Sequence, residues 1–506
     1  MNAPNRAAAL ADRTPFTGRL LIDGQWVDAL DGATIDRASP AHGHRVSVHA
    51  LGGVADADRA VLAARRAFDS GPWQRLKGAE RAALLRRVAD AIVARVDELA
   101  MMETLENGKP LDQAKAEITG AADLWHYAAT LARTLHGDTY NTLGDDTLGL
   151  VLRDPIGVVS IVTPWNFPFL IVSQKLPFAL AAGCTAVVKP SEFTSATTLM
   201  LGQILLDAGL PPGVVNIVVG LGPTVGERLV THPEVDMLSF TGSTGVGKHA
   251  VAASAATLKK VSLELGGKNP QIVFADADLD AALDAAVYGA TFNAGQCCNA
   301  GSRLLLQESI AGEFTRALAQ RMREVRVGDP LDAGVQVGAI TTPRQYESIL
   351  GHLAAARDVG ASLVAGGRPV ARSGQFIEPT VVAGVTPDMP IARDEVFGPV
   401  VSVLTFASLD DAVRLANSTA YGLSAAVWSR DTSTAVSAAR GIRAGTVWLN
   451  TFLEGQPELP FGGYRLSGIG RELGRHAVDD YTETKTLYLH IGRRTSWWLP
   501  RRNHDS

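Results

Sequence analysis

Two side chains of this sequence could together form and hydrolyse a thioester. Glu264 lies between Leu263 and Leu265, ahead of two glycines, and Cys298 follows 34 positions later in a segment of small residues. A thiolate can add to a carbonyl carbon, and a carboxylate can activate the water that later releases the acyl group. The pair therefore predicts covalent catalysis on a carbonyl compound.

Each of these groups depends on its surroundings. A free thiol has a pKa near ~8.5 and is mostly protonated at neutral pH, so Cys298 needs a base, a cation or amide dipoles nearby. The apolar neighbours of Glu264 are expected to raise the pKa of its carboxyl group, which suits a general base. Taken alone, a cysteine is more often buried packing, and a strand glutamate is more often solvated. Chemistry does not separate Cys297 from Cys298.

Seven segments, in their order along the chain, resemble the motifs of the NAD(P)-dependent aldehyde dehydrogenase superfamily. They are residues 164–168, 188–192, 240–244, 263–270, 292–300, 395–399 and 460–464. The resemblance covers roughly residues 20 to 490, and seven motifs in register leave little room for chance. One departure is Arg465, where the family often has lysine.

The resemblance implies an α/β fold of three parts. A Rossmann-type cofactor domain is expected at residues 18–134 and 154–266, and an α/β catalytic domain at residues 267–474. A small β oligomerisation segment is expected at residues 135–153 and 475–495. Exposed strand edges there favour a homodimer or homotetramer.

The matched motifs imply three catalytic residues. The family's nucleophile follows Gly-Gln by two positions, which implies Cys298 rather than Cys297. Glu264 is implied as the base for thioester hydrolysis. Asn166 is implied to offer its side-chain amide, beside the backbone amide of Cys298, to the oxyanion that thiolate addition creates. Outside the family, an asparagine in a Pro-containing turn more often serves the turn itself.

The resemblance also implies contacts with an NAD cofactor. Lys189 and Glu192 are implied at the adenosine ribose and Ser243 at the pyrophosphate, while Glu395 would hold the nicotinamide ribose. The expected cofactor-binding set is Trp165, Lys189, Ser191, Glu192, Gly222, Gly226, Phe240, Gly242, Ser243, Leu265, Glu395 and Phe397. Because the Glu192 carboxylate would repel the 2′-phosphate of NADP, NAD is the expected cofactor and NADP the alternative.

Two glycine-rich segments give weaker phosphate-binding signals. Residues 220–226 follow an apolar strand, but their third glycine comes one residue too late for the usual dinucleotide fingerprint. Residues 242–248 match the core of a triphosphate-binding loop, G-x-x-x-x-G-K. His249 follows where a Ser or Thr hydroxyl would hold magnesium. We therefore expect no triphosphate hydrolysis and no metal site.

A substrate pocket with aromatic and aliphatic walls is implied, suited to a medium-sized organic aldehyde. Its expected lining is Phe167, Leu170, Ile171, Cys297, Asn299, Phe452, Leu453, Glu454 and Phe461. If the Glu454 carboxylate faces the entrance, it would favour aminoaldehydes or betaine-type aldehydes and oppose carboxylated ones. A broad aliphatic or aromatic specificity is the alternative.

Two other functions could use the same scaffold. A catalytically inactive binding or structural protein is disfavoured by the intact Cys298, Glu264 and Asn166. A CoA-acylating aldehyde dehydrogenase is disfavoured by Glu264, because acyl transfer to CoA needs no carboxylate to activate water.

The composition limits the class of protein and its partners. With 506 residues, of which 46% are hydrophobic and 20% charged, the chain can form large cores and more than one domain. A net charge of −5 with dispersed basic residues gives no footprint of nucleic acid. No apolar run approaches the ~18 residues of a membrane span, and Asp12 and Arg13 disfavour a secretory signal. With only three cysteines, we expect a reduced, cytoplasmic protein.

The hydrophobic pattern predicts a doubly wound parallel sheet followed by a second α/β unit. Expected helices lie at residues 56–68, 80–105, 195–208, 279–290 and 310–324, which makes the first hundred residues helix-rich. Expected strands lie at residues 158–162, 185–188, 214–219, 271–274, 304–307 and 400–406, with further alternating segments at 135–153 and 477–492. The sequence leaves open whether the basic tail with Trp497 and Trp498 covers a neighbouring subunit.

Overall fold

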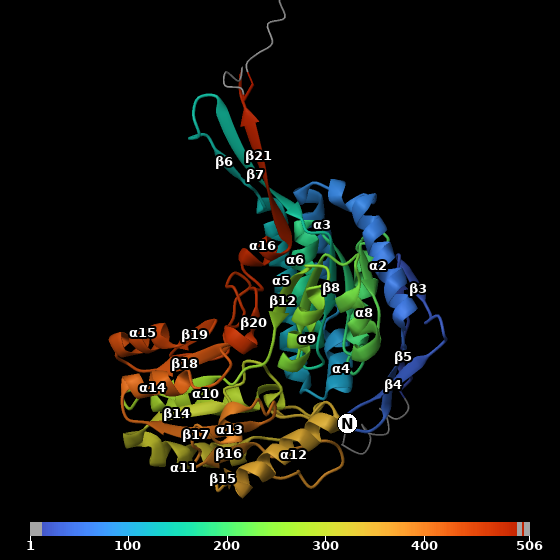
Figure 1. Ribbon diagram of the computed structural model, residues 1–506. Coiled ribbons are helices and arrows are strands. Elements are labelled where there is room, and N and C mark those ends of the chain that lie inside the picture. The colour runs from blue at the N-terminus through green and yellow to red at the C-terminus, as the bar shows by residue number, and fades with distance from the viewer. Residues whose placement is uncertain (1–12, 493–497, 500–506) are drawn as a thin grey trace, which may run out of the picture.

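The computed structural model describes residues 13–492 and 498–499, which form two large sheets with their helices and a projecting arm (Figure 1). The basic tail beyond residue 492, apart from Trp498 and Leu499, lies outside the described residues, as does the amino-terminal segment before residue 13. The expected α/β class is confirmed. No helix in the described part of the chain combines the length and apolar character that a bilayer crossing requires.

An eight-stranded sheet forms the core of the first half, in the order β20-β12-β11-β8-β9-β10-β2-β3. Its parallel strands are β8 (Val158–Val162), β9 (Thr185–Lys189), β10 (Val215–Ile217), β11 (Met237–Thr241) and β12 (Lys260–Glu264). Antiparallel edges are added by β20 (Gly468–Ile469), β2 (Leu20–Ile22) and β3 (Gln25–Val27). The chain runs from β8 to β10 on one side and places β11 and β12 on the other. The switch point therefore lies at β8 and β11, where ligands bind in sheets of this kind.

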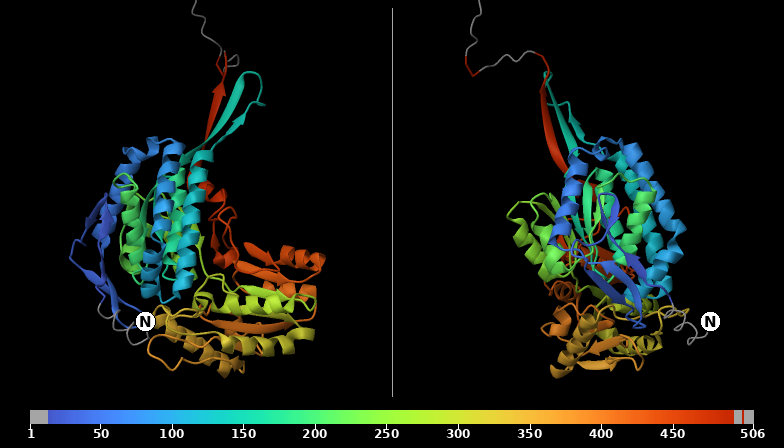
Figure 2. Two further views of the ribbon diagram at one scale, coloured as in Figure 1. Left: turned by 180° about the vertical axis from the view of Figure 1, so that it is seen from behind. Right: turned by 90° about the vertical axis from the view of Figure 1, so that its right-hand side faces the viewer.

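Two groups of helices pack on this sheet (Figures 1 and 2). One group is α2 (Val54–Asp69), α8 (Glu227–Thr231) and α9 (Thr244–Ser254); the other is α3 (Gly78–Ala94), α4 (Val96–Asn107), α5 (Leu111–Thr134), α6 (Pro168–Ala182) and α7 (Ala196–Asp207). Short helical turns lie at η1 (Trp73–Arg75) and η2 (Gly222–Gly226). The helix expected over residues 80–105 is interrupted at Arg95, whose backbone leaves the helical region at φ −117° and ψ 17°.

The expectation of a helix-rich first hundred residues is wrong for residues 16–50. Besides β2 and β3, this segment forms a three-stranded sheet of β1 (Phe16–Gly18), β5 (Arg45–Ala50) and β4 (Thr34–Ala38). The strands are three to six residues long and mix polar with apolar side chains. They therefore lack the continuous β-branched run that identifies a buried strand.

A second sheet of seven strands has the order β15-β16-β17-β14-β13-β18-β19 and is parallel except for β15. Its strands are β13 (Pro270–Val273), β14 (Arg303–Gln307), β15 (Ser362–Ala365), β16 (Thr380–Ala383), β17 (Val400–Phe406), β18 (Ser424–Trp428) and β19 (Thr446–Leu449). Helices α10 (Leu279–Thr291) and α11 (Glu308–Glu324) contribute to one of its cores. The other core takes side chains from α12 (Pro343–Asp358), α13 (Pro390–Arg393), α14 (Leu409–Ala416) and α15 (Thr432–Gly441).

The two segments with alternating side chains pair with each other in the projecting arm. Its strand order is β21-β7-β6, with β6 (Asp138–Tyr140), β7 (Thr147–Pro155) and β21 (Thr482–His490). β21 and β7 run antiparallel with nine paired positions, and Figure 1 shows the arm extending away from both sheets. Three further short elements, η3 (Phe292–Gly295), η4 (Arg465–Ser467) and α16 (His476–Asp480), complete the described fold.

Candidate active site

The three expected catalytic residues come from three connections at the junction of the two sheets. Glu264 is the last residue of β12, Asn166 lies between β8 and α6, and Cys298 lies between η3 and β14. The Asn166 side-chain amide donates to the Gln296 carbonyl at 3.0 Å, and Asn269 Nδ2 donates to the Cys298 carbonyl at 2.7 Å. Residues far apart in the chain are thus tied to one loop.

The loop that carries Cys298 has an unusual backbone. Asn293, Ala294 and Gly295 have consecutive positive φ angles of 48°, 55° and 69°. A Cβ atom on Gly295 would lie 2.0 Å from the carbonyl oxygen of Gly398. Glycine is therefore required there, since the loop passes directly against the segment that carries Glu395.

The two adjacent thiols differ in exposure. Cys298 is partly exposed, whereas Cys297 is 7% exposed and packs in an apolar cluster. A hydrogen bond with the Cys297 sulfur, burial, and the nearby carboxylates of Glu264 and Glu395 raise the pKa of Cys298 well above that of a free thiol. The more accessible thiol is therefore Cys298, and it needs a proton acceptor before it can attack.

Glu264 occupies an apolar position without hydrogen bonds. It is 4% exposed, and neither carboxylate oxygen has a hydrogen-bond partner among the described residues. Burial and the carboxylate of Glu472 raise the pKa of Glu264 well above its usual value, while Lys175 and Arg471 lower it. Lys175 itself donates to Glu472 in a buried ion pair. The expected rise in the pKa of Glu264 is confirmed, and its cause includes a second carboxylate that the sequence did not reveal.

The expected cofactor-binding residues follow the carboxyl edge of the first sheet. Trp165 comes after β8, Lys189 ends β9, Phe240 lies in β11, and Leu265 follows β12. Because these strands are parallel neighbours, their ends meet at one edge, beside the switch point. The structure thus gathers on one surface residues that the sequence spreads over about a hundred positions.

The residues expected to contact the adenosine ribose and the pyrophosphate lie in the middle of this edge. Lys189 Nζ lies 3.6 Å from the Glu192 carboxylate, and burial lowers the pKa of Lys189 although Glu192 opposes this. Ser243 forms the N-cap of α9, where its hydroxyl accepts from the Val246 amide at 3.4 Å. An anion is favoured at such a helix start. Gly242 precedes Ser243 and continues this edge.

The remaining glycines and Ser191 lie beside these groups. No atom lies within 4 Å of the position of a Cβ on Gly222, and a Cβ on Gly226 would meet only the Lys189 side chain at 3.7 Å. Gly222 is exposed and has free space beside it, whereas Gly226 is buried against Lys189. The Ser191 hydroxyl accepts from the Phe193 amide at 3.3 Å, so part of its bonding capacity serves the turn.

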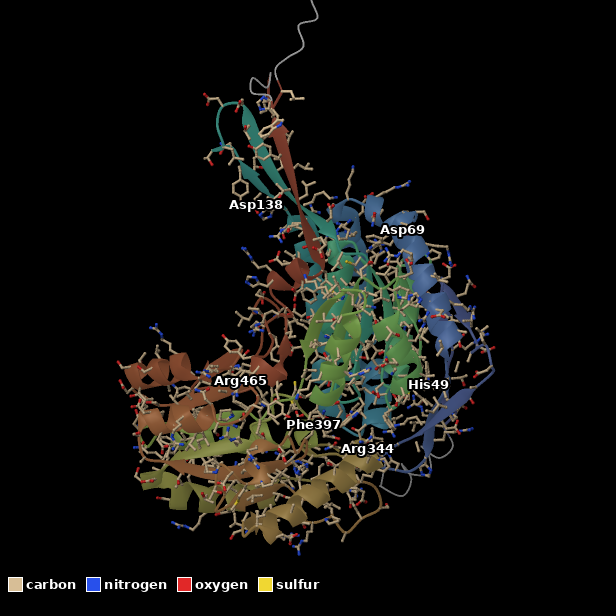
Figure 3. All side chains as sticks on the ribbon, in the orientation of Figure 1. His49, Asp69, Asp138, Arg344, Phe397 and Arg465 are labelled. Atoms are coloured by element: carbon tan, nitrogen blue, oxygen red, sulfur yellow. The ribbon has the colours of Figure 1, made fainter. Side chains whose placement is uncertain are left out.

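Glu395 and Phe397 reach this edge from the second sheet. Glu395 accepts from the Gly267 amide at 3.1 Å, and a Cβ on Gly266 would lie 2.2 Å from its carboxylate. Burial raises the pKa of Glu395 to about 7, although the Gly267 amide and Lys268 lower it. Phe397 makes an edge contact with Trp165 at 5.4 Å between ring centroids. Figure 3 places Phe397 where the two halves of the molecule meet. Together these features fit a dinucleotide bound across the junction.

One side of the loop carries an apolar cluster. Its members are Phe167, Leu170, Ile171, Cys297 and Leu453, all expected from the sequence, together with Phe292 and Ala300. The rings of Phe167 and Phe292 stack at 5.8 Å. Phe292 was not predicted from the sequence. Its aromatic side chain, six positions before Cys298 at the end of α10, was the signal that could have identified it.

The other four residues expected in the pocket do not belong to this apolar cluster. Phe452 packs in the core of the second sheet, where its ring contacts Trp448 at 5.2 Å, and does not belong to the apolar cluster. Phe461 packs against the core of the first sheet. Asn299 is partly exposed beside the Cys298 sulfur at 4.0 Å. Glu454 is exposed, and its carbonyl accepts from Trp448 Nε1 at 2.7 Å.

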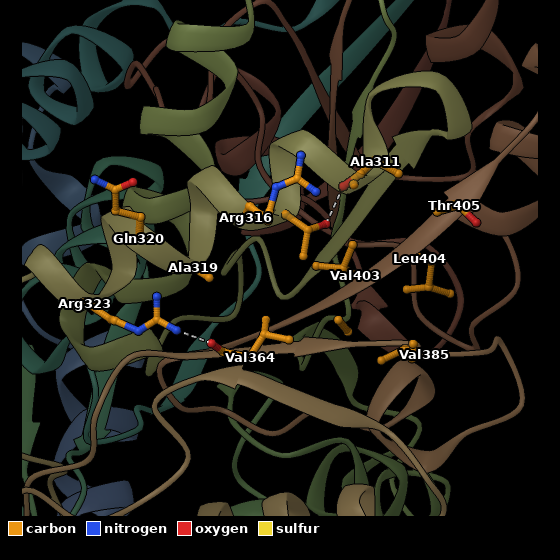
Figure 4. Close-up of a pocket in the computed structure, with 14 residues that line it drawn as sticks. Ala311, Arg316, Ala319, Gln320, Arg323, Val364, Val385, Val403, Leu404 and Thr405 are labelled. Atoms are coloured by element: carbon orange, nitrogen blue, oxygen red, sulfur yellow. Dashed lines mark hydrogen bonds between the residues drawn. The ribbon is translucent and has the colours of Figure 1, made fainter.

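A separate groove lies away from the residues expected in the active site. A groove of about 700 Å³ runs between α11 and strands β15 to β17, and Figure 4 shows Arg316, Gln320 and Arg323 along it. Arg323 donates to the Val364 carbonyl. The groove contains none of the residues expected from the motifs.

Comparison with known proteins gives one consistent result. The model of the aldehyde dehydrogenase family matches residues 26–487. Aldehyde dehydrogenase family 2 member C4 of Arabidopsis thaliana is 42% identical over 483 residues, which are 95% of this chain and 96% of that protein.

Solved structures agree with this chain over nearly its whole length. An NAD-dependent aldehyde dehydrogenase from Sinorhizobium meliloti superposes with a TM-score of 0.96 at 51% identity and 98% coverage of both chains. A betaine aldehyde dehydrogenase from Staphylococcus aureus in complex with NAD+ superposes with a TM-score of 0.94 at 38% identity and 96% coverage of both chains.

Proposed function

Because this chain belongs to the aldehyde dehydrogenase family, we propose that it oxidises an aldehyde to the carboxylic acid through a thioester on Cys298, with NAD as hydride acceptor. The observation that carries this proposal is the meeting of an accessible thiol, a side-chain amide and a buried carboxylate at the edge described above. An inactive scaffold would have no need for a carboxylate held in an apolar site without hydrogen bonds.

The first step is addition of the Cys298 thiolate to the aldehyde carbon. The negative charges on Glu264 and Cys298 disfavour each other, as the raised pKa of Cys298 shows. The thiol proton is released through water to solvent, which leaves the Glu264 carboxylate free to act as the base of the hydrolytic step. The Asn166 amide and the backbone amide of Cys298 donate to the oxyanion that forms.

The second half of the reaction releases the acid. Bound NAD would supply a hydride acceptor for oxidation of the thiohemiacetal on Cys298 to a thioester. Glu264 then takes a proton from the water that attacks the thioester carbon, and the Cys298 thiolate leaves. A carboxyl group with a raised pKa is a stronger base than an ordinary glutamate, which suits this task.

NAD would be held along the carboxyl edge of the first sheet. Lys189 and Glu192 would bind the adenosine ribose, Ser243 the pyrophosphate, and Glu395 the second ribose beside Phe397. Glu192 disfavours the 2′-phosphate of NADP. The Staphylococcus aureus relative, which was solved with NAD+, supports this preference. The corresponding domain proposal is residues 18–134 and 154–266 for the cofactor and residues 267–474 for catalysis.

The proposed substrate is a medium-sized aldehyde with an apolar body, because Phe167, Phe292 and Leu453 provide an apolar wall beside Cys297. A cationic end group, as in an aminoaldehyde or betaine-type aldehyde, is the more specific version of this proposal. It rests on the exposed carboxylate of Glu454 and on the likeness to a betaine aldehyde dehydrogenase. Broad aliphatic or aromatic specificity is the second candidate, since the wall itself is neutral.

The arm supports a homodimer or homotetramer. β21 is the edge strand of its sheet and exposes Leu487, Tyr488 and Leu489, the middle one to 72%. β19 is likewise an edge strand of the second sheet. Unpaired strand edges with exposed apolar side chains favour pairing with another copy. Three unpaired cysteines in the described residues fit a reducing compartment such as the cytoplasm.

The decisive experiment is NADH formation, followed by absorbance, with a panel of cationic, neutral and anionic aldehydes and with NADP as a control. We expect turnover with NAD, little with NADP, and a measurable order among the aldehydes. Folded protein that binds NAD but turns over no aldehyde in the panel would contradict the proposal.

A further inference from the structure

A buried network of amides and hydroxyls lies behind the nucleophile loop. Its members are Asn107, Asn166, Asn293, Gln296 and Thr341, none of them more than 3% exposed. They come from four segments: the end of α4, the turn after β8, the nucleophile loop and the connection before α12. Buried polar groups of this kind fix the relative position of the segments that they join.

The Asn166 amide is tethered to the nucleophile loop itself. Its Nδ2 donates one hydrogen to the Gln296 carbonyl at 3.0 Å, and the same carbonyl accepts from Asn293 Nδ2 at 3.2 Å. An amide nitrogen has two hydrogens, so one remains for an oxyanion. The distance between the amide and the Cys298 thiol therefore depends on where the Gln296 carbonyl is held.

The Gln296 side chain holds that carbonyl from within the loop. Its Nε2 donates to the Asn293 carbonyl at 3.1 Å, and its Oε1 accepts from the Thr341 backbone amide at 2.9 Å. Asn293 and Ala294 have left-handed backbone conformations, which are unfavourable for residues other than glycine. Such a turn persists only when its surroundings hold it, and Thr341 is part of those surroundings.

Thr341 also reaches the turn that carries Asn166. Its hydroxyl donates to the Asn107 carbonyl at 2.9 Å and accepts from Asn107 Nδ2 at 3.2 Å. Asn107 Nδ2 in turn donates to the Trp165 carbonyl at 2.9 Å. Thr341 thus binds the nucleophile loop through its backbone and the oxyanion turn through its hydroxyl.

We propose that Thr341 is a positioning residue that sets the spacing between the Asn166 amide and the Cys298 thiol, acting through Asn107 and Gln296. This inference rests on the proposed role of Asn166 at the oxyanion. It assigns to a buried hydroxyl, which touches no reacting atom, an effect on the rate of every step that forms a tetrahedral oxyanion on Cys298.

The test compares Thr341→Val, which keeps the shape but removes the hydroxyl, with Thr341→Ser, which keeps the hydroxyl. Two reactions of Cys298 are measured without cofactor: acylation by a p-nitrophenyl ester, which passes through an oxyanion, and alkylation by iodoacetamide, which does not. We expect Thr341→Val to slow acylation by about tenfold or more and alkylation by less than about twofold. Thr341→Ser should restore acylation to within about threefold of the original rate.

For aldehyde oxidation, the same loss should appear in kcat with little change in KM, since Thr341 contributes nothing to substrate binding. Equal losses of acylation and alkylation in Thr341→Val, or a failure of Thr341→Ser to restore acylation, would overturn the inference. If Thr341→Val does not fold, Gln296→Met removes the acceptor for the Thr341 amide, and the same split between the two reactions is expected.

A double-mutant cycle with Asn166→Ala separates the inference from the function on which it rests. If Thr341 acts through Asn166, then Thr341→Val changes acylation by less than about twofold once Asn166 is alanine. The same fold loss in both backgrounds overturns the role of Thr341 alone. Unchanged acylation in Asn166→Ala overturns both the oxyanion assignment and the inference.

Discussion

The proposed nucleophile, Cys298, and the proposed base, Glu264, have opposite surroundings. The loop of Cys298 is held by hydrogen bonds from neutral amides, with Asn166 and Gln296 at its centre. The Glu264 carboxylate has no hydrogen-bond partner among the described residues and instead lies near the charges of Glu472 and Lys175. The difference indicates that position limits what the thiol can do, whereas proton affinity limits what the carboxylate can do.

This contrast follows from the chemistry that each group performs. Addition of a thiolate requires one carbon to be in contact with sulfur while its oxygen meets two donors, so small displacements are costly. A general base acts through water and tolerates some freedom, but its pKa must suit the operating pH. Variants in the loop of Cys298 and variants around Glu264 should therefore lose activity in different ways.

The largest effect is expected from the thiols. Cys298→Ala should lower aldehyde oxidation by at least about 10⁴-fold, since the covalent step is lost. Cys297→Ala should cost about tenfold or less, because it removes only an apolar wall contact. NADH formation by the two variants, with NAD binding as the control for folding, measures this. Comparable losses in both variants would mean that the exposure of Cys298 does not identify the nucleophile.

Substitution of Glu264 should impair a later step of the reaction than substitution of Cys298. Glu264→Gln keeps the shape of the side chain but removes its basicity, so steady-state turnover should fall by about 10²- to 10⁴-fold. A rapid burst of NADH, stoichiometric with active sites, should precede the slow phase because the thioester still forms. Stopped-flow absorbance would record both phases. Absence of the burst would show that Glu264 is also essential for thiolate formation.

The charges around Glu264 predict a shift in pH dependence. The pKa of Glu264 is raised in the folded protein, so the carboxylate form and the hydrolysis rate should increase as pH rises through that value. Glu472→Gln removes a carboxylate that raises this pKa and frees Lys175, which lowers it. The rising limb of the curve of hydrolysis rate against pH should therefore move to lower pH by about one unit, which corresponds to about 1.4 kcal/mol.

The matched variant is Lys175→Met, which removes a positive charge and should move the same limb to higher pH. Hydrolysis of the acylated enzyme, followed as a function of pH in all three proteins, measures both shifts. If the pH–rate curves of both variants moved in the same direction, the electrostatic explanation would be excluded.

The fold shows where sequence patterns carry information and where they do not. Strands β8 and β17 match the predicted ranges 158–162 and 400–406 at both ends, because strands buried on both faces appear as continuous β-branched runs. The short strands of residues 16–50 were missed because most of them mix polar and apolar side chains, and the apolar β2 has only 3 residues.

The candidate site shows the same division. Cys298, Glu264 and Asn166 were predicted from motifs, and the neighbours of Glu264 predicted its raised pKa. Thr341 and Asn107 gave no signal, since they are 234 positions apart and an amide or hydroxyl carries no periodic pattern. Their contribution comes from tertiary hydrogen bonds, which local sequence does not encode.

The smallest expected effect concerns substrate charge. Glu454 is exposed, so its interaction with a cationic aldehyde is screened and should contribute no more than about 1 kcal/mol, or about fivefold. Glu454→Gln should therefore lower kcat/KM for cationic aldehydes relative to neutral ones by up to that factor, and added salt should reduce the difference. Because this part of the site depends on a flexible surface charge rather than a fixed network, only the ratio should change and not the chemistry.

Glu458 offers a matched control, since it is an exposed carboxylate four positions further along the same loop. Glu458→Gln should leave the ratio of cationic to neutral aldehydes within about twofold, because Glu458 is not among the residues proposed to line the pocket and an exposed charge is screened by solvent. If both variants change the ratio equally, long-range attraction explains the preference. If neither does, the apolar wall of Phe167 and Phe292 alone determines specificity, and a broad range of aldehydes is the better description.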